Sequence, residues 1–230
     1  MLAVSAAMKA DMVAMGLPAD RIRVHHTGVD HARFRPVDRA PRDQNGAKAA
    51  LDVTGPLVVS VGALIPRKRH DIVIDAVAAL PGVTLLIAGE GPERAPLEAQ
   101  IARHGISDRV RLLGAVPHTD LPRLIAAADV SALASSSEGL ANAWVESLAC
   151  GTPIVITDAG GAPEVVTSPD AGRVTIRDGL AFAAAIDALL KDPPTAAATC
   201  ATAAAFTWEA NTTALYAHLA TLAANHPSSG

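Results

Sequence analysis

Short apolar runs alternate with longer stretches of helical periodicity along most of the chain. Each spacing between two runs leaves room for one helix. This alternation is typical of a parallel β-sheet that is covered by helices on both faces. We therefore predict an α/β fold with a doubly wound parallel sheet. The predicted strands are Leu57–Val61, Val83–Ala88, Val110–Leu113, Val130–Leu133, Pro153–Ile156 and Arg173–Ile176, and the intervening helices include His70–Leu80, Glu93–His104 and Asn142–Cys150.

The loops that follow these strands are where we expect a ligand. Open parallel sheets bind their ligands at the carboxyl ends of the strands. All five loops after the first five strands are rich in glycine, in charged or small polar residues, or in both. They read GALIPRKRH, GEGPE, GAVPHTD, SSSEGLAN and TDAGGAPE.

The fourth of these loops combines two glutamates with the start of a helix. In this strand-to-helix turn a serine can cap the helix, and Gly139 lets a ligand approach the backbone closely. Glu146 lies about 7 Å along the helix axis from the turn, within reach of a ribose diol, and Glu138 reaches the other side of a bound phosphate. Four backbone amides are then available to such an anion: those of Gly139, Leu140, Ala141 and Asn142.

Composition argues against several classes of partner. With a net charge of −4 and scattered lysines and arginines, the chain has no basic stripe for nucleic acid and no polybasic segment for a membrane surface. No apolar run approaches the roughly 20 residues of a membrane-spanning helix. The amphipathic start contains Lys9 and Asp11, unlike a signal peptide. We expect a cytoplasmic protein, with peripheral association at the inner face of the membrane as an alternative.

Two cysteines, Cys150 and Cys200, stand far apart in alanine-rich surroundings. Neither belongs to a CxxC motif or has a histidine at metal-ligand spacing. We therefore expect two buried thiols rather than a disulfide or a zinc site.

Five stretches, in this order, carry a resemblance to a known family: VGALIPRKRHD, LLIAGEGPE, RVRLLGAVPHTDLPRLIAAADV, SSSEGLANAWVESLACGTPIVITDAGGAPEVV and FTWEANTTALY. Together they resemble the donor-binding half of retaining glycosyltransferases of the GT-B fold, family 4, also called glycosyl transferases group 1. The family signature of two glutamates separated by seven residues corresponds to Glu138 and Glu146. The resemblance implies a Rossmann-like sheet that forms the C-terminal half of a GT-B fold.

The resemblance also implies how the chain is organised. Residues 1–35 look like the end of the family's acceptor domain with its NGVD-like hinge, in which Thr27 replaces the usual asparagine. Residues 36–55 then form a linker, 56–205 the domain that binds the nucleotide-sugar donor, and 206–230 a C-terminal crossover helix and tail. Met1 falls inside the acceptor-domain segment, so we expect a fragment, a mis-started frame or a stand-alone donor domain that binds the donor without transferring sugar alone.

Several residues match positions with known roles in the family. Lys68 corresponds to the lysine that neutralises the donor diphosphate, and Gly62 to the glycine that opens the same loop. Glu146 corresponds to the glutamate that binds the ribose hydroxyls, and Glu138 to the one that contacts the transferred sugar. The base is implied to pack near Val116, against backbone groups. Lys68 and Glu138 are therefore the implied catalytic residues, with a solvated surface role as the alternative for each.

Two departures from the family pattern fall in the first loop. Ala63 occupies a position that is often arginine, and Arg67 either substitutes for that arginine or is a surface residue. Arg69 replaces the glycine that usually follows the lysine, so we expect a less compact turn. Three histidines are expected to be solvated rather than to act as general bases: His25, His26 and His70.

The implied reaction is retaining transfer from a nucleotide-diphosphate sugar to a saccharide or lipid acceptor, in which the leaving phosphate acts as the base. The chain has no Asp-x-Asp pair, so we expect no metal cofactor. It also lacks GxxxxGK and a complete GxGxxG, which argues against an NTPase or a dinucleotide enzyme. The alternatives are a non-catalytic nucleotide-sugar binding module and an epimerase or phosphorylase of the same fold, of which a phosphorylase would carry pyridoxal phosphate.

The C-terminal helix is implied to cross back to the acceptor domain. If that domain is missing, the apolar residues of the helix lack part of their partner surface and favour self-association or a partner chain. These residues are Phe206, Trp208, Leu215 and Tyr216.

Overall fold

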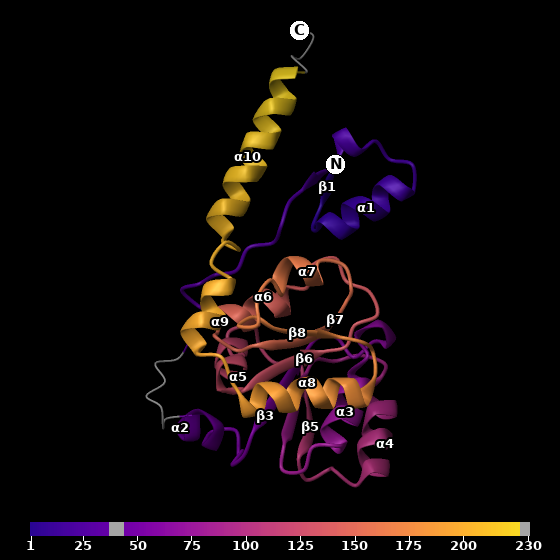
Figure 1. Cartoon of the computed structure of the whole chain (residues 1–230), viewed down its shortest axis with the longest axis vertical. Coiled ribbons are helices and arrows are strands. Elements are labelled where there is room, and N and C mark those ends of the chain that lie inside the picture. Colours follow the sequence, from indigo (N-terminus) through magenta and orange to yellow (C-terminus); the bar gives the residue numbers. More distant parts are fainter. Residues whose placement is uncertain (37–43, 226–230) are drawn as a thin grey trace.

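The structure, a computed structural model, describes residues 1–36 and 44–225 (Figure 1). The predicted linker over 36–55 and the predicted C-terminal segment over 206–230 therefore lie partly outside the described residues. The strands are β1 Leu2–Ala3, β2 Arg23–Val24, β3 Leu57–Val61, β4 Thr84–Ala88, β5 Val110–Gly114, β6 Val130–Leu133, β7 Ile154–Thr157 and β8 Gly172–Thr175. The helices are α1 Ala6–Ala14, α2 Gln44–Ala49, α3 His70–Ala78, α4 Arg94–His104, α5 Leu121–Ala127, α6 Asn142–Ala149, α7 Ala162–Val165, α8 Gly179–Lys191, α9 Ala196–Thr202 and α10 Trp208–Asn225, with 3₁₀ turns η1 Ala19–Arg21 and η2 Pro66–Lys68.

Six of the strands form one parallel sheet in the order β5-β4-β3-β6-β7-β8. This confirms the predicted α/β fold, and each predicted strand lies within one residue of the observed one at either end. The chain builds outward from β3 to β5 and then returns to continue from β6 on the other side of β3. The strand order therefore reverses between β3 and β6, and the loops after these two strands leave the sheet side by side. Such a switch point is where open α/β sheets bind their ligands.

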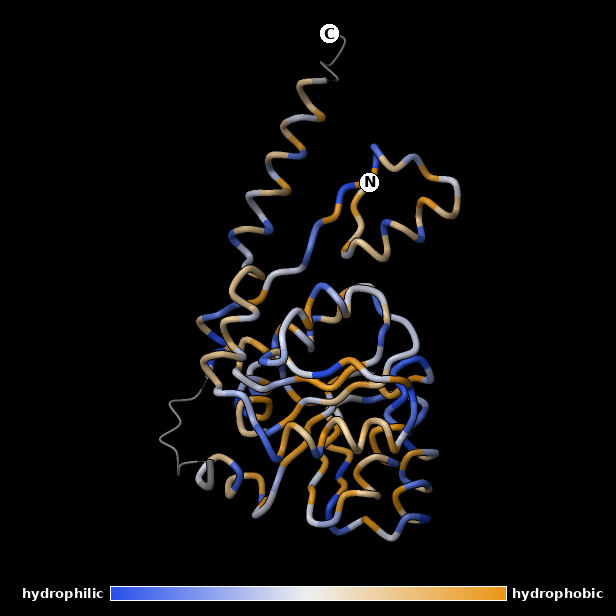
Figure 2. Tube along the Cα trace, viewed as in Figure 1, coloured by the Kyte–Doolittle hydropathy of each residue, from blue (hydrophilic) through white to orange (hydrophobic). Residues whose placement is uncertain are grey.

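The two faces of the sheet are covered by different helices (Figure 1). Side chains of successive strand residues point to opposite faces, so Val59 of β3 belongs to a core with α5, α6 and α7, while Val58 belongs to a core with α3, α4 and α8. Figure 2 shows apolar positions gathered where these helices meet the strands. Burial on both faces is the reason why the strands read as continuous apolar runs.

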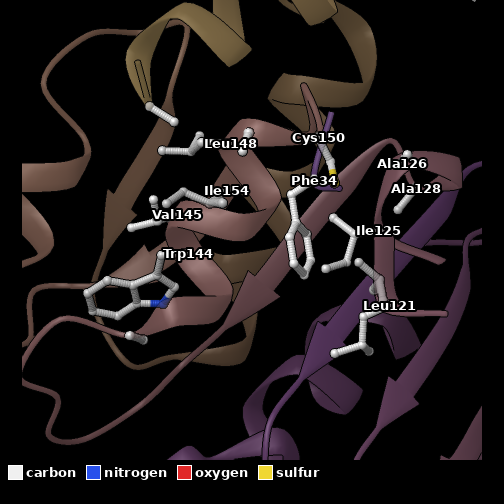
Figure 3. Close-up of a cluster of buried hydrophobic side chains, with 14 of the residues drawn as sticks. Phe34, Leu121, Ile125, Ala126, Ala128, Trp144, Val145, Leu148, Cys150 and Ile154 are labelled. Atoms are coloured by element: carbon white, nitrogen blue, oxygen red, sulfur yellow. The ribbon is translucent and has the colours of Figure 1, made fainter. Parts of the chain in front are cut away.

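The segment that follows β2 is part of the first core. Phe34 is 1% exposed and lies among side chains of α5, close to Ile125 (Figure 3). Val29 forms a parallel bridge with Thr207, and its amide donates to the carbonyl of Phe206 at 3.0 Å. The hinge-like segment is thus attached both to the sheet domain and to the start of the C-terminal helix.

The N-terminal segment forms a small unit of its own. β1 and β2 pair in parallel, and α1 connects them. α10 extends away from the sheet (Figure 1). Among the described helices, none is both long and apolar enough to cross a membrane.

The expected exposure of apolar residues near the C-terminus holds only in part. Trp208 and Tyr216 are 52% and 75% exposed, and Leu215 is partly buried. Phe206 is only 8% exposed because it packs in the first core. The prediction was therefore wrong for Phe206, which lies before α10 and faces the sheet domain.

The loop after β4 supports the loop after β3 through close backbone contact. The amides of Gly62 and Leu64 donate to the carbonyls of Ala88 and Glu90 at 3.0 and 2.8 Å. A Cβ added at Gly89, which has φ +154°, would lie 1.9 Å from the carbonyl oxygen of Gly62. Only glycine allows this approach, so Gly89 fixes where the first loop of the site runs.

We expect Gly89→Ala to lower the free energy of unfolding by at least about 3 kcal/mol, the range of a substitution that forces the backbone to move. Gly105→Ala is the matched control, because its φ is also positive but nothing lies within 4 Å of the added Cβ; its expected cost is about 1–2 kcal/mol. Urea denaturation of both variants measures the difference. Equal losses would show that the contact with Gly62 does not constrain the loop.

Candidate functional site

The loops after β3 and β6 are joined by hydrogen bonds at the switch point. The amide of Ser136 donates to the carbonyl of Arg67 at 2.7 Å, and the Arg67 guanidinium donates to the carbonyl of Ser137 at 3.2 Å. The two strands are parallel neighbours, so their carboxyl ends reach the same edge of the sheet. The two loops thereby form one surface.

A buried ion pair links the two residues predicted to be catalytic. Lys68 Nζ lies 2.6 Å from Glu138 Oε1, and the side chains are only 12% and 7% exposed. Arg67 Nη1 lies 3.4 Å from Glu138 Oε2, with its own side chain half exposed. Arg67 therefore lies beside the predicted site residue Glu138 rather than elsewhere on the surface. Two cations face one carboxylate, so positive charge is in excess around Glu138.

Gly62 lies beside the stem of Lys68. A Cβ added at Gly62 would lie 3.6 Å from Lys68 Cδ and Cε, which is ordinary van der Waals contact, and its φ is not positive. The surrounding protein thus does not require glycine here, in contrast to Gly89.

The turn after Lys68 keeps a tight conformation. Arg69 takes the left-handed conformation, with φ 50° and ψ 45°, that glycine favours, at a cost of about 1–2 kcal/mol. Its guanidinium forms a bidentate pair with the carboxylate of Asp71, with Nη2–Oδ2 at 2.8 Å. The expectation of a looser turn was wrong, because this ion pair stabilises the conformation without a glycine.

The start of α6 differs from the prediction. Ala141 is the N-cap residue, and no side chain caps the helix. The predicted serine cap was wrong because the last serine, Ser137, lies four residues before the N-cap. Instead, Thr27 donates a hydrogen bond to Asn142 Oδ1 at 3.0 Å. Within the described part of the chain, the amides of residues 139–142 have no hydrogen-bond acceptor, while the side chains of Leu140 and Ala141 are buried in the core.

Gly139 is approached closely by other parts of the protein. A Cβ there would lie 2.5 Å from Val4 Cγ2 and 3.0 Å from Met8 Cε. The amide of Gly161 donates to the Gly139 carbonyl at 2.7 Å, and a Cβ at Gly160 would lie 1.9 Å from the Glu138 carbonyl oxygen. The loop after β7 and the N-terminal segment together hold the turn that carries Glu138.

Glu146 lies on the second turn of α6 and faces the loop after β5. Its side chain is 13% exposed, and His118 Nε2 lies 3.1 Å from its Oε1. The sequence analysis did not identify His118, whose only signal is its position in a loop at the carboxyl edge. Val116, from the same loop, lines an apolar cavity of about 720 Å³ between α2 and α5, together with Leu51 and Leu113.

The three histidines do not share one environment. His26 is exposed and pairs with Glu164 at 2.7 Å, while the Glu164 carboxylate also accepts from the amide of Ala6 at 2.9 Å. His25 is partly buried. His70 is 2% exposed, and its Nδ1 lies 3.0 Å from the hydroxyl of Ser60. The prediction that His70 is solvated was wrong, because the first residue of α3 points inward onto β3.

The cysteines also differ from each other. Cys150 is fully buried beside α5, as predicted. Cys200, on α9, is only partly buried, so the prediction of a second fully buried thiol was wrong. Partial burial still raises the pKa of the Cys200 thiol. No disulfide joins them.

The sequence matches the family of glycosyl transferases group 1 over residues 41–205. The chain belongs to this family. D-inositol 3-phosphate glycosyltransferase of Mycobacterium marinum is 40% identical over 210 residues, which cover 86% of this chain but 44% of that protein. The chain thus spans less than half the length of this relative.

Two solved structures superpose closely on this chain. Sucrose-phosphate synthase from Thermosynechococcus elongatus matches with a TM-score of 0.88 and 27% identity, over 97% of this chain and 58% of that one. HepE from Anabaena, in complex with UDP and glucose, matches with a TM-score of 0.84 and 28% identity, over 95% of this chain and 62% of that one. Most of the described fold is therefore shared with these proteins.

The burial of His70 predicts a loss of stability in weak acid. Burial lowers the pKa of His70 from 6.5 to about 4, an effect that the backbone of Ala63 and Gly62 partly opposes. Between these values the unfolded chain binds a proton that the folded chain excludes, so the free energy of unfolding falls as pH falls from 6.5 to 4. The shift corresponds to about 3 kcal/mol.

We expect urea denaturation at several pH values to show this slope in the wild type and in His104→Gln, and to show a reduced slope in His70→Gln. His104 is the matched control because it is an exposed histidine, paired with Asp75. An equal slope in all three proteins would place the titration on another group.

Proposed function

We propose that this chain is the donor-binding half of a retaining glycosyltransferase that takes a nucleoside-diphosphate sugar, with a UDP-sugar as the first candidate. One observation carries the proposal: Arg67 and Lys68 converge on Glu138 at the switch point, on the same edge of the sheet as Glu146. The structural likeness to HepE, which is solved with UDP and with UDP-glucose, supports the choice of donor.

The excess positive charge suits a diphosphate. In the proposed complex the diphosphate oxygens take the place of the Glu138 carboxylate beside Lys68 and Arg67, and the unpaired amides at the start of α6 donate to the same anion. Charge builds on these oxygens as the sugar leaves. Cations placed in advance therefore stabilise the transition state more than the ground state, and they do so here without a metal ion.

The two glutamates then have separate tasks. Glu146 accepts hydrogen bonds from the ribose hydroxyls, and Glu138, released from Lys68, faces the transferred sugar. In the proposed reaction the bond between the anomeric carbon and the phosphate oxygen breaks, and the nucleoside diphosphate leaves with the electron pair. The acceptor oxygen bonds to the same face of the carbon, and its proton passes to a phosphate oxygen.

The acceptor is proposed to be a saccharide or a lipid carrying hydroxyl groups. The mycobacterial relative is named for D-inositol 3-phosphate, so a phosphorylated cyclitol is the first acceptor to test. In the relatives, much of the protein lies outside the region that aligns with this chain. We expect the acceptor to bind to that part, facing the proposed donor site.

Nucleotide binding tests this function directly. We expect a thermal shift with UDP-, GDP- or ADP-sugars, since a ligand at 100 times its dissociation constant stabilises the fold by about 2.7 kcal/mol. Glu146→Gln is expected to weaken UDP binding by about 1.5–3 kcal/mol, the scale of charged hydrogen bonds. Glu138→Gln is expected to strengthen binding of UDP severalfold, because the neutral amide no longer competes with the diphosphate for Lys68.

Calorimetry on the two glutamine variants separates these roles. Equal losses of UDP affinity in both would contradict the assignment of Glu138 to the sugar and Glu146 to the ribose. If no nucleotide sugar of the three classes shifts the melting temperature, the proposed function itself fails.

Gly62→Ala gives a second, independent test. The added methyl would meet the stem of Lys68 and His70 Nε2 only at ordinary van der Waals distances of 3.6–3.7 Å, so we expect little change in melting temperature. We expect at least a tenfold loss of UDP affinity, about 1.4 kcal/mol, because the methyl occupies the space proposed for the diphosphate. Gly82→Ala is the converse control. Gly82 has φ +78° and open surroundings, and it lies just before β4, at the opposite edge of the sheet. The Gly82→Ala variant should therefore lower stability and leave UDP affinity unchanged. Unchanged UDP affinity in Gly62→Ala would show that the diphosphate does not bind next to Gly62.

A further inference from the structure

Glu146 is contacted by a histidine whose own position is fixed by a distant arginine. His118 Nε2 lies 3.1 Å from Glu146 Oε1, and Arg33 Nη1 lies 3.2 Å from His118 Nδ1. The three residues come from α6, from the loop after β5 and from the segment after β2. They form a continuous chain of hydrogen bonds that ends at the carboxylate proposed to bind ribose.

The chemistry of Arg33 determines the direction of these hydrogen bonds. A guanidinium only donates, so Nδ1 of His118 must accept from it, and the single proton of the neutral ring is then on Nε2. That proton is donated to Glu146. The opposite tautomer would place an N–H against the guanidinium and a bare nitrogen against a carboxylate, which loses both hydrogen bonds.

The imidazole ring is also held by packing. Its centroid lies 5.2 Å from that of Phe34, with an angle of 59° between the rings, and Phe34 is anchored in the core. The amide of Phe34 donates to the carbonyl of Asp30 at 2.7 Å, and the Asp30 carboxylate accepts from the amide of Ala32. The turn that carries Arg33 is therefore fixed, although the His118 side chain is 57% exposed.

We propose that His118, oriented by Arg33, is a positioning residue that holds the Glu146 carboxylate ready for the ribose hydroxyls. This inference rests on the proposed function and extends it to two residues outside the glutamate signature. With Oε1 engaged by His118, Oε2 is available to the ligand and the side chain has fewer rotamers to lose on binding. Fixing a flexible side chain in advance is worth about three- to tenfold in affinity.

Paired amide substitutions test the role of the Nε2 proton. Gln carries an amide nitrogen near the position of Nε2, and Asn carries one near Nδ1. We expect His118→Asn to weaken UDP binding by about three- to tenfold and to reduce the preference for UDP over 2′-deoxy-UDP. His118→Gln is expected to keep most of both. Arg33→Ala is expected to reduce the preference as well, because the ring is no longer oriented.

His104→Asn is the matched control, since His104 Nε2 also contacts a carboxylate, that of Asp75, at 2.7 Å, on the surface of α4. This variant should leave the binding of UDP and of 2′-deoxy-UDP unchanged. In a Glu146→Gln background, His118→Asn is expected to have no further effect, as required if His118 acts through Glu146.

The outcomes separate this inference from the proposed function. Equal weakening of UDP and 2′-deoxy-UDP by His118→Asn, or a full effect in the Glu146→Gln background, would overturn the positioning role while leaving donor binding intact. Unchanged UDP affinity together with an unchanged preference for UDP over 2′-deoxy-UDP in His118→Asn would also overturn the positioning role. If the wild type binds none of UDP, GDP and ADP in calorimetry, the proposed function fails and this inference fails with it.

Discussion

The site depends on the register between β3 and β6, which Asp129 fixes from both sides. Its amide donates to the carbonyl of Leu57 at 2.8 Å, and its carboxylate accepts from the amide of Leu57 at 2.7 Å. Lys48 neutralises the same carboxylate. The two strands start level with each other and run parallel, so the loops at their other ends emerge together. Lys68 and Glu138, which are 70 residues apart in sequence, meet because of this alignment.

The ion pair at the switch point compensates a largely buried charge. A largely buried lysine with no partner is costly, so the carboxylate of Glu138 neutralises Lys68. The backbone of Glu138 is held by Gly160, where a Cβ would overlap its carbonyl oxygen. A ligand that brings its own negative charge can replace the carboxylate at Lys68 without leaving the ammonium unpaired. The same pairing disfavours neutral ligands, because they would have to separate the two charges without compensation.

The sequence predicted those features that follow from local periodicity and strand order. The strands were found because burial on both faces gives continuous apolar runs. The loops that carry Lys68 and Glu138 were expected at the ligand-binding edge because parallel strands end there, whereas the role of Lys68 came from the family resemblance. Side-chain environments were harder to predict. The inward orientation of His70 depends on its contact with Ser60 of β3, and the role of His118 depends on Arg33, 85 residues earlier. Arg69 keeps a turn typical of glycine because Asp71 pairs with it. Each of these outcomes depends on a partner that no local pattern reveals.

The segment before the sheet domain contacts α6 at two points that are one turn apart. Thr27 donates to Asn142 at the first residue of the helix, and Arg33 reaches Glu146 through His118. The same segment is anchored in the core by Phe34, and the unit that precedes it is attached to α7 through Glu164. Movement of the segment that carries Thr27 and Arg33 would therefore either break the contact with Asn142 or displace the start of α6. Because both proposed ligand-binding glutamates flank that start, we expect the position of this segment to affect the geometry of the proposed donor site.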